Sequence, residues 1–362
     1  MSSRAMRSSP WLFEEFPELE GKVPWTPLGD FPTPVQKLDK LSSREGICEV
    51  WVKRDDRSSE LYGGNKVRKL EFTLADAAAR GKRYVLTYGG IGSNHALATT
   101  IHSRRLGLKA ILILFPQPVT RHVQENLLLD AHFGAELILA KNSLEAALKT
   151  LWQIVTKRSV YVLPLGGSTA LGALGFVDAM LELRRQIDAG ELSEPRKIFL
   201  ALGTGGTMAG LLVGAKLAGL DSQVVGVRVT SSRIGNERKV ANLANRVVRL
   251  LKRHSESIPD LRFSPSDVSV VHGFYGPGYG VPTPECVEAA KIVREAEGIR
   301  LDLTYTAKAF AALLSEARSG AEGPLLFWNT FNSVDLSALA ERQDPRSLPK
   351  EFQAFFEGEP SF

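Results

Sequence analysis

Cysteine and long apolar runs are both scarce in this chain of 362 residues. The two cysteines, Cys48 and Cys286, lie far apart without a C-x-x-C pair, so neither a disulfide framework nor a zinc cluster is indicated. No eighteen uncharged apolar residues follow one another, and the first twenty residues contain no apolar run of signal-peptide length. We therefore expect a cytoplasmic protein that neither spans a membrane nor holds a metal.

The 40 acidic residues are slightly outnumbered by the 45 lysines and arginines, which gives a net charge of +5. The basic excess concentrates in residues 233 to 254, a segment that could suggest nucleic acid. Val240, Leu243, Val247 and Leu251 recur there at helical spacing, and no aromatic residues are interleaved with the charges. The segment predicts an ordinary amphipathic surface helix, and a small anionic ligand is a more economical partner than nucleic acid.

Strand-like apolar runs alternate with helix-like segments over most of the chain, without internal repeats. This alternation predicts an α/β fold with parallel sheets covered by helices, and the length favours two lobes. Strand, glycine and helix alternate four times between residues 59 and 168. We therefore predict a small α/β domain at 59–168, inserted in a larger domain formed by 1–58 and 169–362.

The segment "ALGTGGTMAG", residues 201 to 210, predicts a strand, a glycine-rich turn and the start of a helix. Free amides at such a turn, together with the positive end of the helix dipole, form an anion pocket that phosphate usually occupies. The candidate phosphate-binding residues are Gly203, Thr204, Gly205, Gly206 and Thr207. The spacing matches neither G-x-G-x-x-G nor a P-loop, and a merely structural turn remains the alternative.

A second strand, glycine and helix sequence occurs in "YGGIGSNHALA", residues 88 to 98. Ser93 or Asn94 can cap the helix, because both side chains accept hydrogen bonds from amides of the first turn. His95 taken alone is typical of a packing histidine. The three glycines exceed what one cap needs, so this loop also predicts close backbone approach to a flat ligand.

Lys66 follows Gly63, Gly64 and Asn65 at the point where a loop is expected to become a helix. A surface lysine needs no preceding glycines, whereas a lysine whose amine must reach a bound aldehyde needs its backbone held close. Four cations are its neighbours in sequence: Lys53, Arg54, Arg68 and Lys69. Nearby cations lower the pKa of an amine and favour the neutral nucleophile. A phosphate pocket, a loop for a planar ring and an activated lysine together indicate pyridoxal 5'-phosphate, which forms a Schiff base with lysine.

The chain resembles the fold type II pyridoxal phosphate enzymes, which are tryptophan synthase β-like, and within them the D-cysteine desulfhydrase and 1-aminocyclopropane-1-carboxylate deaminase family. The motifs that carry the resemblance span roughly residues 25 to 335 in the family's order: "GGNKVRKLE", "GGIGSNHALA", "LGGSTALGALGFVDAMLEL", "LGTGGTMAGL", "YGPGYGVP", "EGIRLDLTYTAKA" and "LLFWNTFNS". The family suggests a homodimer.

The resemblance implies a role for each matching residue. Lys66 would bind the cofactor aldehyde, the turn from Gly203 to Thr207 would hold the phosphate, and Asn94 would bond to the phenolic oxygen of the ring. Ser93, Asn94 and His95 would lie near the substrate carboxylate. Two tyrosines that match those facing the substrate, and the threonine of the last motif beside the ring, complete the set: Tyr279, Tyr305 and Thr330.

Two positions favour the desulfhydrases within this family. The ring-opening deaminases carry glutamate after the second tyrosine and leucine in the last motif, where this chain has Thr306 and Thr330. A carboxylate would keep the pyridine nitrogen protonated through a charge-assisted contact, whereas a threonine hydroxyl can donate to an unprotonated nitrogen. The last motif also departs from the family, because "NTFNS" has Asn329 for histidine and has Phe331 and Asn332 for glycines.

The sequence thus predicts a lyase or deaminase that performs β-elimination on a small amino acid, most simply D-cysteine, and yields a 2-oxo acid and ammonia. Lys66 or a tyrosine would remove the α-proton. The alternatives are 1-aminocyclopropane-1-carboxylate deaminase activity, an amino-acid racemase or L-specific eliminase, and a noncatalytic ligand-binding homologue.

Overall fold

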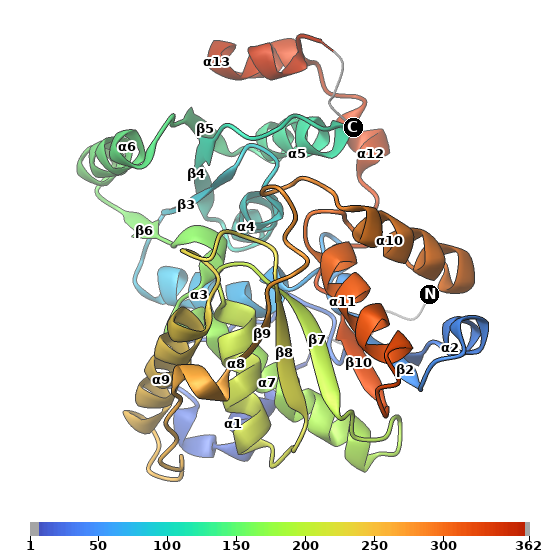
Figure 1. The fold of residues 1–362 in the computed structure, drawn as a ribbon. Helices are drawn as coiled ribbons and strands as arrows, with labels where there is room; N and C mark the ends of the chain where they lie inside the picture. The colour runs from blue at the N-terminus through green and yellow to red at the C-terminus, as the bar shows by residue number, and fades with distance from the viewer. Residues whose placement is uncertain (1–6, 359–362) are drawn as a thin grey trace. The chain divides into compact units, whose positions relative to one another are not determined.

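The computed structural model describes residues 7–358 (Figure 1), and their contacts divide them into two compact units. Unit 1 comprises the described residues up to Val23, with Gly29–Lys69 and Ser168–Ser333. Unit 2 comprises Pro24–Leu28, Leu70–Gly167 and the described residues from Val334 onward. The domain limits expected from the sequence, 59–168 within 1–58 and 169–362, stay a prediction.

Unit 1 contains a six-stranded sheet. In spatial order its strands are β1 (Val35–Lys37), β2 (Val50–Lys53), β10 (Leu325–Trp328), β7 (Lys197–Leu202), β8 (Gln223–Arg228) and β9 (Ser269–Val271). All neighbouring strands run parallel except the edge pair β1 and β2. The central strand β10 is buried along its whole length and consists of apolar residues, as expected of a strand covered on both faces.

Helices complete unit 1 and bury its apolar core. They are α1 (Trp11–Glu15), α2 (Asp39–Glu45), α7 (Ala170–Asp188), α8 (Gly206–Leu217), α9 (Glu237–Lys252), α10 (Pro284–Glu297) and α11 (Thr306–Arg318). Phe310 of α11 packs edge to face on Phe327 of β10, with ring centroids 5.0 Å apart. In α9 the predicted apolar positions Val240, Leu243 and Val247 are buried, which confirms the amphipathic helix expected in the basic segment.

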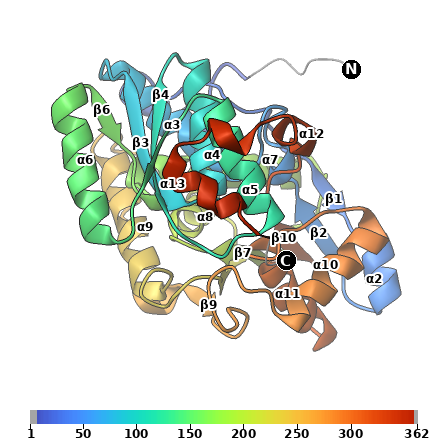
Figure 2. The same ribbon diagram turned by 90° about the horizontal axis from the view of Figure 1, so that it is seen from above.

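Unit 2 contains a four-stranded parallel sheet. Its spatial order is β5 (Glu136–Leu139), β4 (Lys109–Phe115), β3 (Tyr84–Gly90) and β6 (Val160–Val162). The helices are most of α3 (Lys66–Ala79), then α4 (Asn94–Arg105), α5 (Arg121–His132), α6 (Ser143–Lys157), α12 (Ser337–Ala340) and α13 (Lys350–Gln353). The predicted parallel α/β alternation is thereby confirmed, and Figures 1 and 2 show the helices flanking the sheet.

The two faces of this sheet carry separate apolar clusters. On one face Leu112 and Leu114 of β4 pack with Leu127 of α5, and Phe352 from the C-terminal segment joins them. The chain steps from β3 to β4 to β5 in one direction and then returns to β6 beyond β3, so right-handed crossovers place α6 on the opposite face. No helix within residues 7–358 is long and apolar enough to cross a membrane.

Candidate active site

The two glycines before Lys66 allow the chain to pass close to other backbone atoms of unit 1. A Cβ added at Gly63 would lie 2.4 Å from the carbonyl oxygen of Asp56. Gly64 has φ +88°, and a Cβ there would lie 2.9 Å from the carbonyl oxygen of Thr330. Helix α3 begins directly afterwards, at Lys66. The glycines therefore fix the start of this helix beside the end of strand β10.

The amine of Lys66 lies in an environment that favours its neutral form. The side chain is half-buried, and its Nζ donates to Oδ1 of Asn65 at 2.7 Å. Burial lowers the pKa of Lys66 to about 8, although the negative charge of Asp302 acts in the opposite direction. The direction expected from the sequence is confirmed, but the attribution of the shift to neighbouring cations was wrong.

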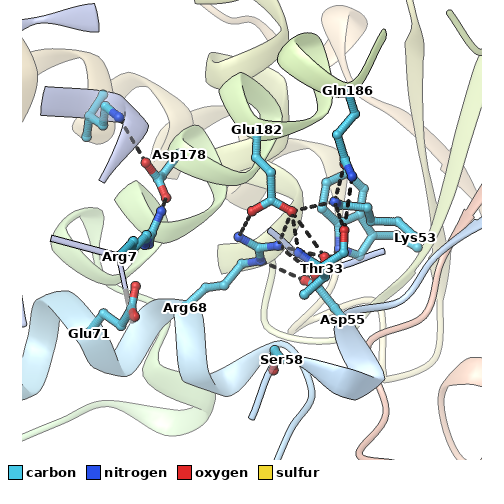
Figure 3. Close-up of polar contacts among 12 residues, drawn as sticks. Arg7, Thr33, Lys53, Asp55, Ser58, Arg68, Glu71, Asp178, Glu182 and Gln186 are labelled. Atoms are coloured by element: carbon cyan, nitrogen blue, oxygen red, sulfur yellow. Dashed lines mark hydrogen bonds and ion pairs between the residues drawn. The ribbon is translucent and has the colours of Figure 1, made fainter. Parts of the chain in front are cut away.

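Two of the neighbouring cations, Lys53 and Arg68, have carboxylate partners of their own (Figure 3). Arg68 contacts Asp55 at 2.8 Å and Glu182 at 2.9 Å, and Lys53 forms an ion pair with the same glutamate. All four side chains are at most 1% exposed. We call these four residues, Lys53, Asp55, Arg68 and Glu182, the buried ion network. Trp328 at the end of β10 donates to Asp55 at 2.7 Å, so the network ties α3 to β2, α7 and β10.

The glycine-rich turn predicted to bind phosphate lies at the start of α8. Gly205 has φ +87° and precedes the first helical residue, Gly206, whose amide donates to Oγ of Ser168 at 3.2 Å. A Cβ added at Gly206 would lie 2.6 Å from Oγ of Ser168 and 3.0 Å from Nζ of Lys69. The absence of a side chain at Gly206 thus lets helix amides, a hydroxyl and a lysine amine converge, which is the donor set that an anion requires.

Lys69 is a contributor to this turn that the sequence interpretation overlooked. It follows Lys66 by three positions, so both lysines lie on one side of α3. Its side chain is 3% exposed, and burial together with the charge of Lys66 lowers its pKa well below the usual value. A phosphate group beside it would favour the charged amine. Asn65 also bonds across to the turn, donating to Oγ1 of Thr207 at 3.0 Å.

The two predicted tyrosines meet within unit 1. The hydroxyls of Tyr279 and Tyr305 are hydrogen-bonded, and their ring centroids are 6.0 Å apart. A Cβ added at Gly203 would lie 3.9 Å from Cε1 of Tyr305, which places that ring beside the glycine turn. Burial raises the pKa of both tyrosines. Both hydroxyls therefore stay protonated near neutral pH and can act as donors.

Thr306, the first residue of α11, directs its hydroxyl to a residue just before the helix. It is 1% exposed and donates to Oδ1 of Asp302 at 2.5 Å. The same carboxylate accepts the amide of Tyr305 at 2.8 Å and thereby caps the start of α11. The Thr306 hydroxyl is thus bound to the capping carboxylate of Asp302. The comparison of Thr306 with the glutamate of the deaminases did not anticipate this contact.

The last motif, "NTFNS", which departs from the family, contacts the loop that precedes Lys66. Oδ1 of Asn332 accepts the amide of Gly63 at 2.7 Å, and the carbonyl of Thr330 accepts the amide of Asn65 at 3.1 Å. Asn332, which stands where the family usually has glycine, therefore helps to hold the loop that precedes Lys66.

The second predicted loop belongs to unit 2. Ser93 caps α4 by accepting the amide of Ala96 at 3.3 Å, so the capping interpretation is confirmed for this residue. Oδ1 of Asn94 accepts from Asn126 at 3.0 Å, and His95 is buried with Nε2 2.9 Å from Oγ1 of Thr87. These contacts are typical of helix capping and packing, and the predicted cofactor and substrate contacts of the three residues stay predictions.

Protein atoms account for the glycines of this loop. A Cβ added at Gly89 would lie 2.4 Å from Cβ of Ser93, and one at Gly92 would lie 2.6 Å from Cγ2 of Val123. Close packing against neighbouring side chains is therefore sufficient to favour glycine at these two positions without a ligand.

Comparison with known proteins agrees with the pyridoxal phosphate cofactor expected from the sequence. The family model described as "Pyridoxal-phosphate dependent enzyme" matches residues 27–330. A Thermotoga maritima protein provisionally named 1-aminocyclopropane-1-carboxylate deaminase is 37% identical over 317 residues, which is 86% of this chain and 97% of the relative. The D-cysteine desulfhydrase of Salmonella newport is 35% identical over 319 residues, 85% of this chain and 93% of the relative.

A solved structure supports the fold. A crystal structure described as that of an ACC deaminase homologue superimposes with a TM-score of 0.73 at 30% identity and covers 94% of this chain and 99% of that one. The likeness extends over both units, so the parallel α/β architecture predicted from the sequence is that of a fold type II enzyme. The chain belongs to the pyridoxal-phosphate dependent enzymes, and its cofactor is pyridoxal 5'-phosphate.

Proposed function

We propose that this enzyme performs β-elimination on a small amino acid, in the manner of a D-cysteine desulfhydrase. D-cysteine and water would give pyruvate, sulfide and ammonia. The observation that carries the proposal is the pKa of the Lys66 amine, which is lowered to about 8. Lys66 is the first residue of α3, and Lys69, one turn later in the same helix, lies beside the glycine turn. An amine with that pKa can act as nucleophile and as base near neutral pH.

The residues of unit 1 fit pyridoxal phosphate. Gly206 leaves free the space between Ser168 and Lys69 that a Cβ would fill, and phosphate suits these donors. Gly203, Thr204, Gly205, Gly206 and Thr207 would hold the phosphate, Lys66 would bind the aldehyde, and Thr330 and Asn94 would contact the ring. When bound, the cofactor supplies an electron sink for the charge left by α-proton removal.

The chain's own groups divide the proton transfers between them. Lys66 Nζ is the group that accepts the α-proton, because its lowered pKa leaves a useful fraction neutral at pH 7 to 8. Tyr279 and Tyr305 have raised pKa values and are poor bases, so their hydroxyls would serve as donors to the departing sulfur. Ser93, Asn94 and His95 would fix the substrate carboxylate.

The choice of D-cysteine rests on Thr306 and Thr330. Neither side chain can give the pyridine nitrogen the charge-assisted contact that a carboxylate would. A weaker electron sink suffices when a good leaving group such as sulfide departs, whereas opening a cyclopropane ring demands more. The names of the relatives do not separate the two activities, because both occur at 35% to 37% identity.

The central experiment is Lys66→Ala in the purified protein. We expect loss of the visible absorbance of the lysine-bound cofactor and of 2-oxo acid release. A variant that keeps both the absorbance band and full turnover would refute the assignment of Lys66. Lys291→Ala, a change at a lysine 73% exposed on α10, is the matched control and should alter neither.

The substrate is tested with a panel of D-cysteine, L-cysteine, D-serine and 1-aminocyclopropane-1-carboxylate. Release of 2-oxo acid from D-cysteine alone supports the proposal, and release from the cyclopropane amino acid instead favours the deaminase alternative. Turnover of L-cysteine, or inversion without release, favours the L-specific eliminase or the racemase. Cofactor absorbance without any turnover favours a noncatalytic homologue.

We also propose that the enzyme is cytoplasmic and works as a homodimer. Both cysteines are free, with Cys286 buried and Cys48 half-buried, as suits a reducing compartment. The homodimer is carried over from the family, and the mass of the protein in solution tests it.

A further inference from the structure

The loop of unit 1 that carries Tyr279 makes few hydrogen bonds of its own. We call residues 275–283, which lie between strand β9 and helix α10, the tyrosine loop. Within it, the amide of Val281 donates to the carbonyl of Gly278 at 3.3 Å. None of the amides of residues 276–280 donates a hydrogen bond to another of the described residues. The position of Tyr279 therefore depends on contacts between the tyrosine loop and other segments.

Lys308 of α11 holds the start of the tyrosine loop. Its side chain is fully buried, and its Nζ donates to the carbonyl oxygen of Tyr275 at 2.6 Å. The same Nζ lies 5.6 Å from the centroid of the Tyr275 ring. Burial of a lysine is costly unless its amine is hydrogen-bonded, so the contact with Tyr275 accounts for a lysine at this position.

Two further contacts fix the same end of the loop. The guanidinium of Arg228, the last residue of β8, lies 4.8 Å from the centroid of the Tyr275 ring, so that ring has a second cation beside it. Gly276 has φ +75°, and a Cβ there would lie 2.5 Å from Cγ2 of Thr283 and 3.9 Å from Nζ of Lys308. The start of the tyrosine loop therefore packs closely against its last residue, beside the lysine amine.

The start of α11 contacts the tyrosine loop at two points. Tyr305 directly precedes this helix, and Lys308 follows three positions later. The hydroxyl of Tyr305 is bonded to that of Tyr279, whereas Lys308 binds the carbonyl of Tyr275. One short segment therefore holds both the hydroxyl of Tyr279 and the backbone that leads to it.

We propose that Lys308 is a positioning residue for Tyr279, because its bond to the carbonyl of Tyr275 keeps the tyrosine loop where the Tyr279 hydroxyl can give a proton to the leaving group. This inference rests on the proposed β-elimination. In that reaction the bond between carbon and sulfur breaks, its electron pair stays on sulfur, and Tyr279 supplies the proton. Tyr279 is 38% exposed and regains its proton from solvent. A chloride leaving group departs without a proton and makes no demand on Tyr279.

The test is Lys308→Met in the full-length protein with cofactor bound. Methionine keeps an unbranched apolar side chain and removes the donor. We expect chymotrypsin to cleave after Tyr275 or Tyr279 about 10-fold faster or more than in the wild type, because loss of a hydrogen bond from a charged donor raises the fraction of open loop by that factor. Lys291→Met, at a lysine 73% exposed on α10, is the matched control and should be cleaved at the wild-type rate. Cofactor absorbance should remain unchanged in both variants.

A comparison of two substrates connects the loop to the reaction. In Lys308→Met, kcat for D-cysteine should fall about 10-fold or more. Turnover of 3-chloro-D-alanine, which with water gives pyruvate, chloride and ammonium, should stay at the wild-type level. Tyr279→Phe should show the same pattern. The double variant should be no slower with D-cysteine than Tyr279→Phe alone, because Lys308 acts through Tyr279.

A second variant perturbs the same end of the loop without removing the lysine. Gly276→Ala places a methyl group against Thr283 and should repeat both effects of Lys308→Met, and it supplies both measurements if Lys308→Met does not fold. Cleavage at the wild-type rate in either variant, an equal loss of turnover with the two substrates, or a double variant that is slower by the full effect of Lys308→Met would overturn the proposal. A wild type that turns over neither substrate would refute the proposed function instead, and the cleavage rates would still decide the role of Lys308.

Discussion

Replacing Glu182 by glutamine tests whether the buried ion network stabilises unit 1. Glu182 lies in α7, is 1% exposed, and pairs with both Arg68 and Lys53. Glutamine keeps the shape of the side chain and removes the negative charge, so two buried cations would be left with Asp55 as their remaining partner in the network. Removing one partner of a buried ion pair typically costs about 3–5 kcal/mol.

The pKa of Glu182 gives an independent magnitude. Burial alone would raise it, but the charges of Arg68 and Lys53 outweigh burial and lower the pKa from 4.5 to about 2. At 1.36 kcal/mol per unit, this shift corresponds to about 3 kcal/mol of stability. Because the folded pKa is the lower one, that stability is fully present above pH 4.5 and is lost as the pH falls toward 2. Both routes therefore predict a loss of about 3 kcal/mol at pH 7.

Urea unfolding and thermal melting at pH 7 measure this effect. A loss of about 3 kcal/mol should lower the melting temperature by about 6–12 °C for a unit of this size. The matched control is Glu322→Gln, because Glu322 is 82% exposed and pairs with Arg196 at the surface, where such pairs contribute about 0–1 kcal/mol. The difference between wild type and Glu182→Gln should shrink as the pH falls below 4.5. A Glu182→Gln variant no less stable than the control, or a difference independent of pH, would refute the reasoning.

Two further predictions concern the lysines of α3. Lys69→Gln should weaken the binding of pyridoxal phosphate by about 10-fold or more, since one charge-assisted hydrogen bond contributes about 1.5–3 kcal/mol; absorbance titration measures this, Lys291→Gln is the control, and unchanged affinity would contradict the placement of Lys69 at the phosphate. For Lys66, only the neutral amine reacts with an aldehyde, so the rate at which cofactor-free enzyme combines with pyridoxal phosphate should rise with pH, with its midpoint at about 8, and level off at higher pH. Stopped-flow absorbance measures that profile, and a midpoint near 10 would show that burial does not lower the pKa of Lys66.

Local patterns carried much of the prediction. The strands and helices of unit 2 follow from apolar periodicity and from glycines at their ends, because both signals act within one or two turns of the chain. The same holds for α9, whose buried stripe was predicted from spacing alone. The loop before Lys66 and the glycine turn at 203–207 were also found from sequence, since each requires glycine for a local backbone reason.

Contacts between distant segments could not be read in this way. Arg68 and Glu182 are 114 positions apart, and nothing local marks them as partners. Lys69 was interpreted only as a neighbouring cation, because it is the approach of α3 to Gly206 in the folded chain that brings its amine to the glycine turn. Helix α6 lies in the region 59–168 where the sequence predicts alternating strands and helices, but which of its faces meets the sheet depends on side chains in β3 and β4.

The sequence by itself determined the α/β alternation and the family motifs, and it singled out Lys66 as the candidate reactive lysine, because these depend on residue type and on spacing along the chain. The tertiary structure decided the cause of the lowered pKa of Lys66, the partners of the buried charges and the outward face of α6. Burial and charge pairing arise only when segments far apart in sequence pack together, so residue order alone does not contain them in readable form.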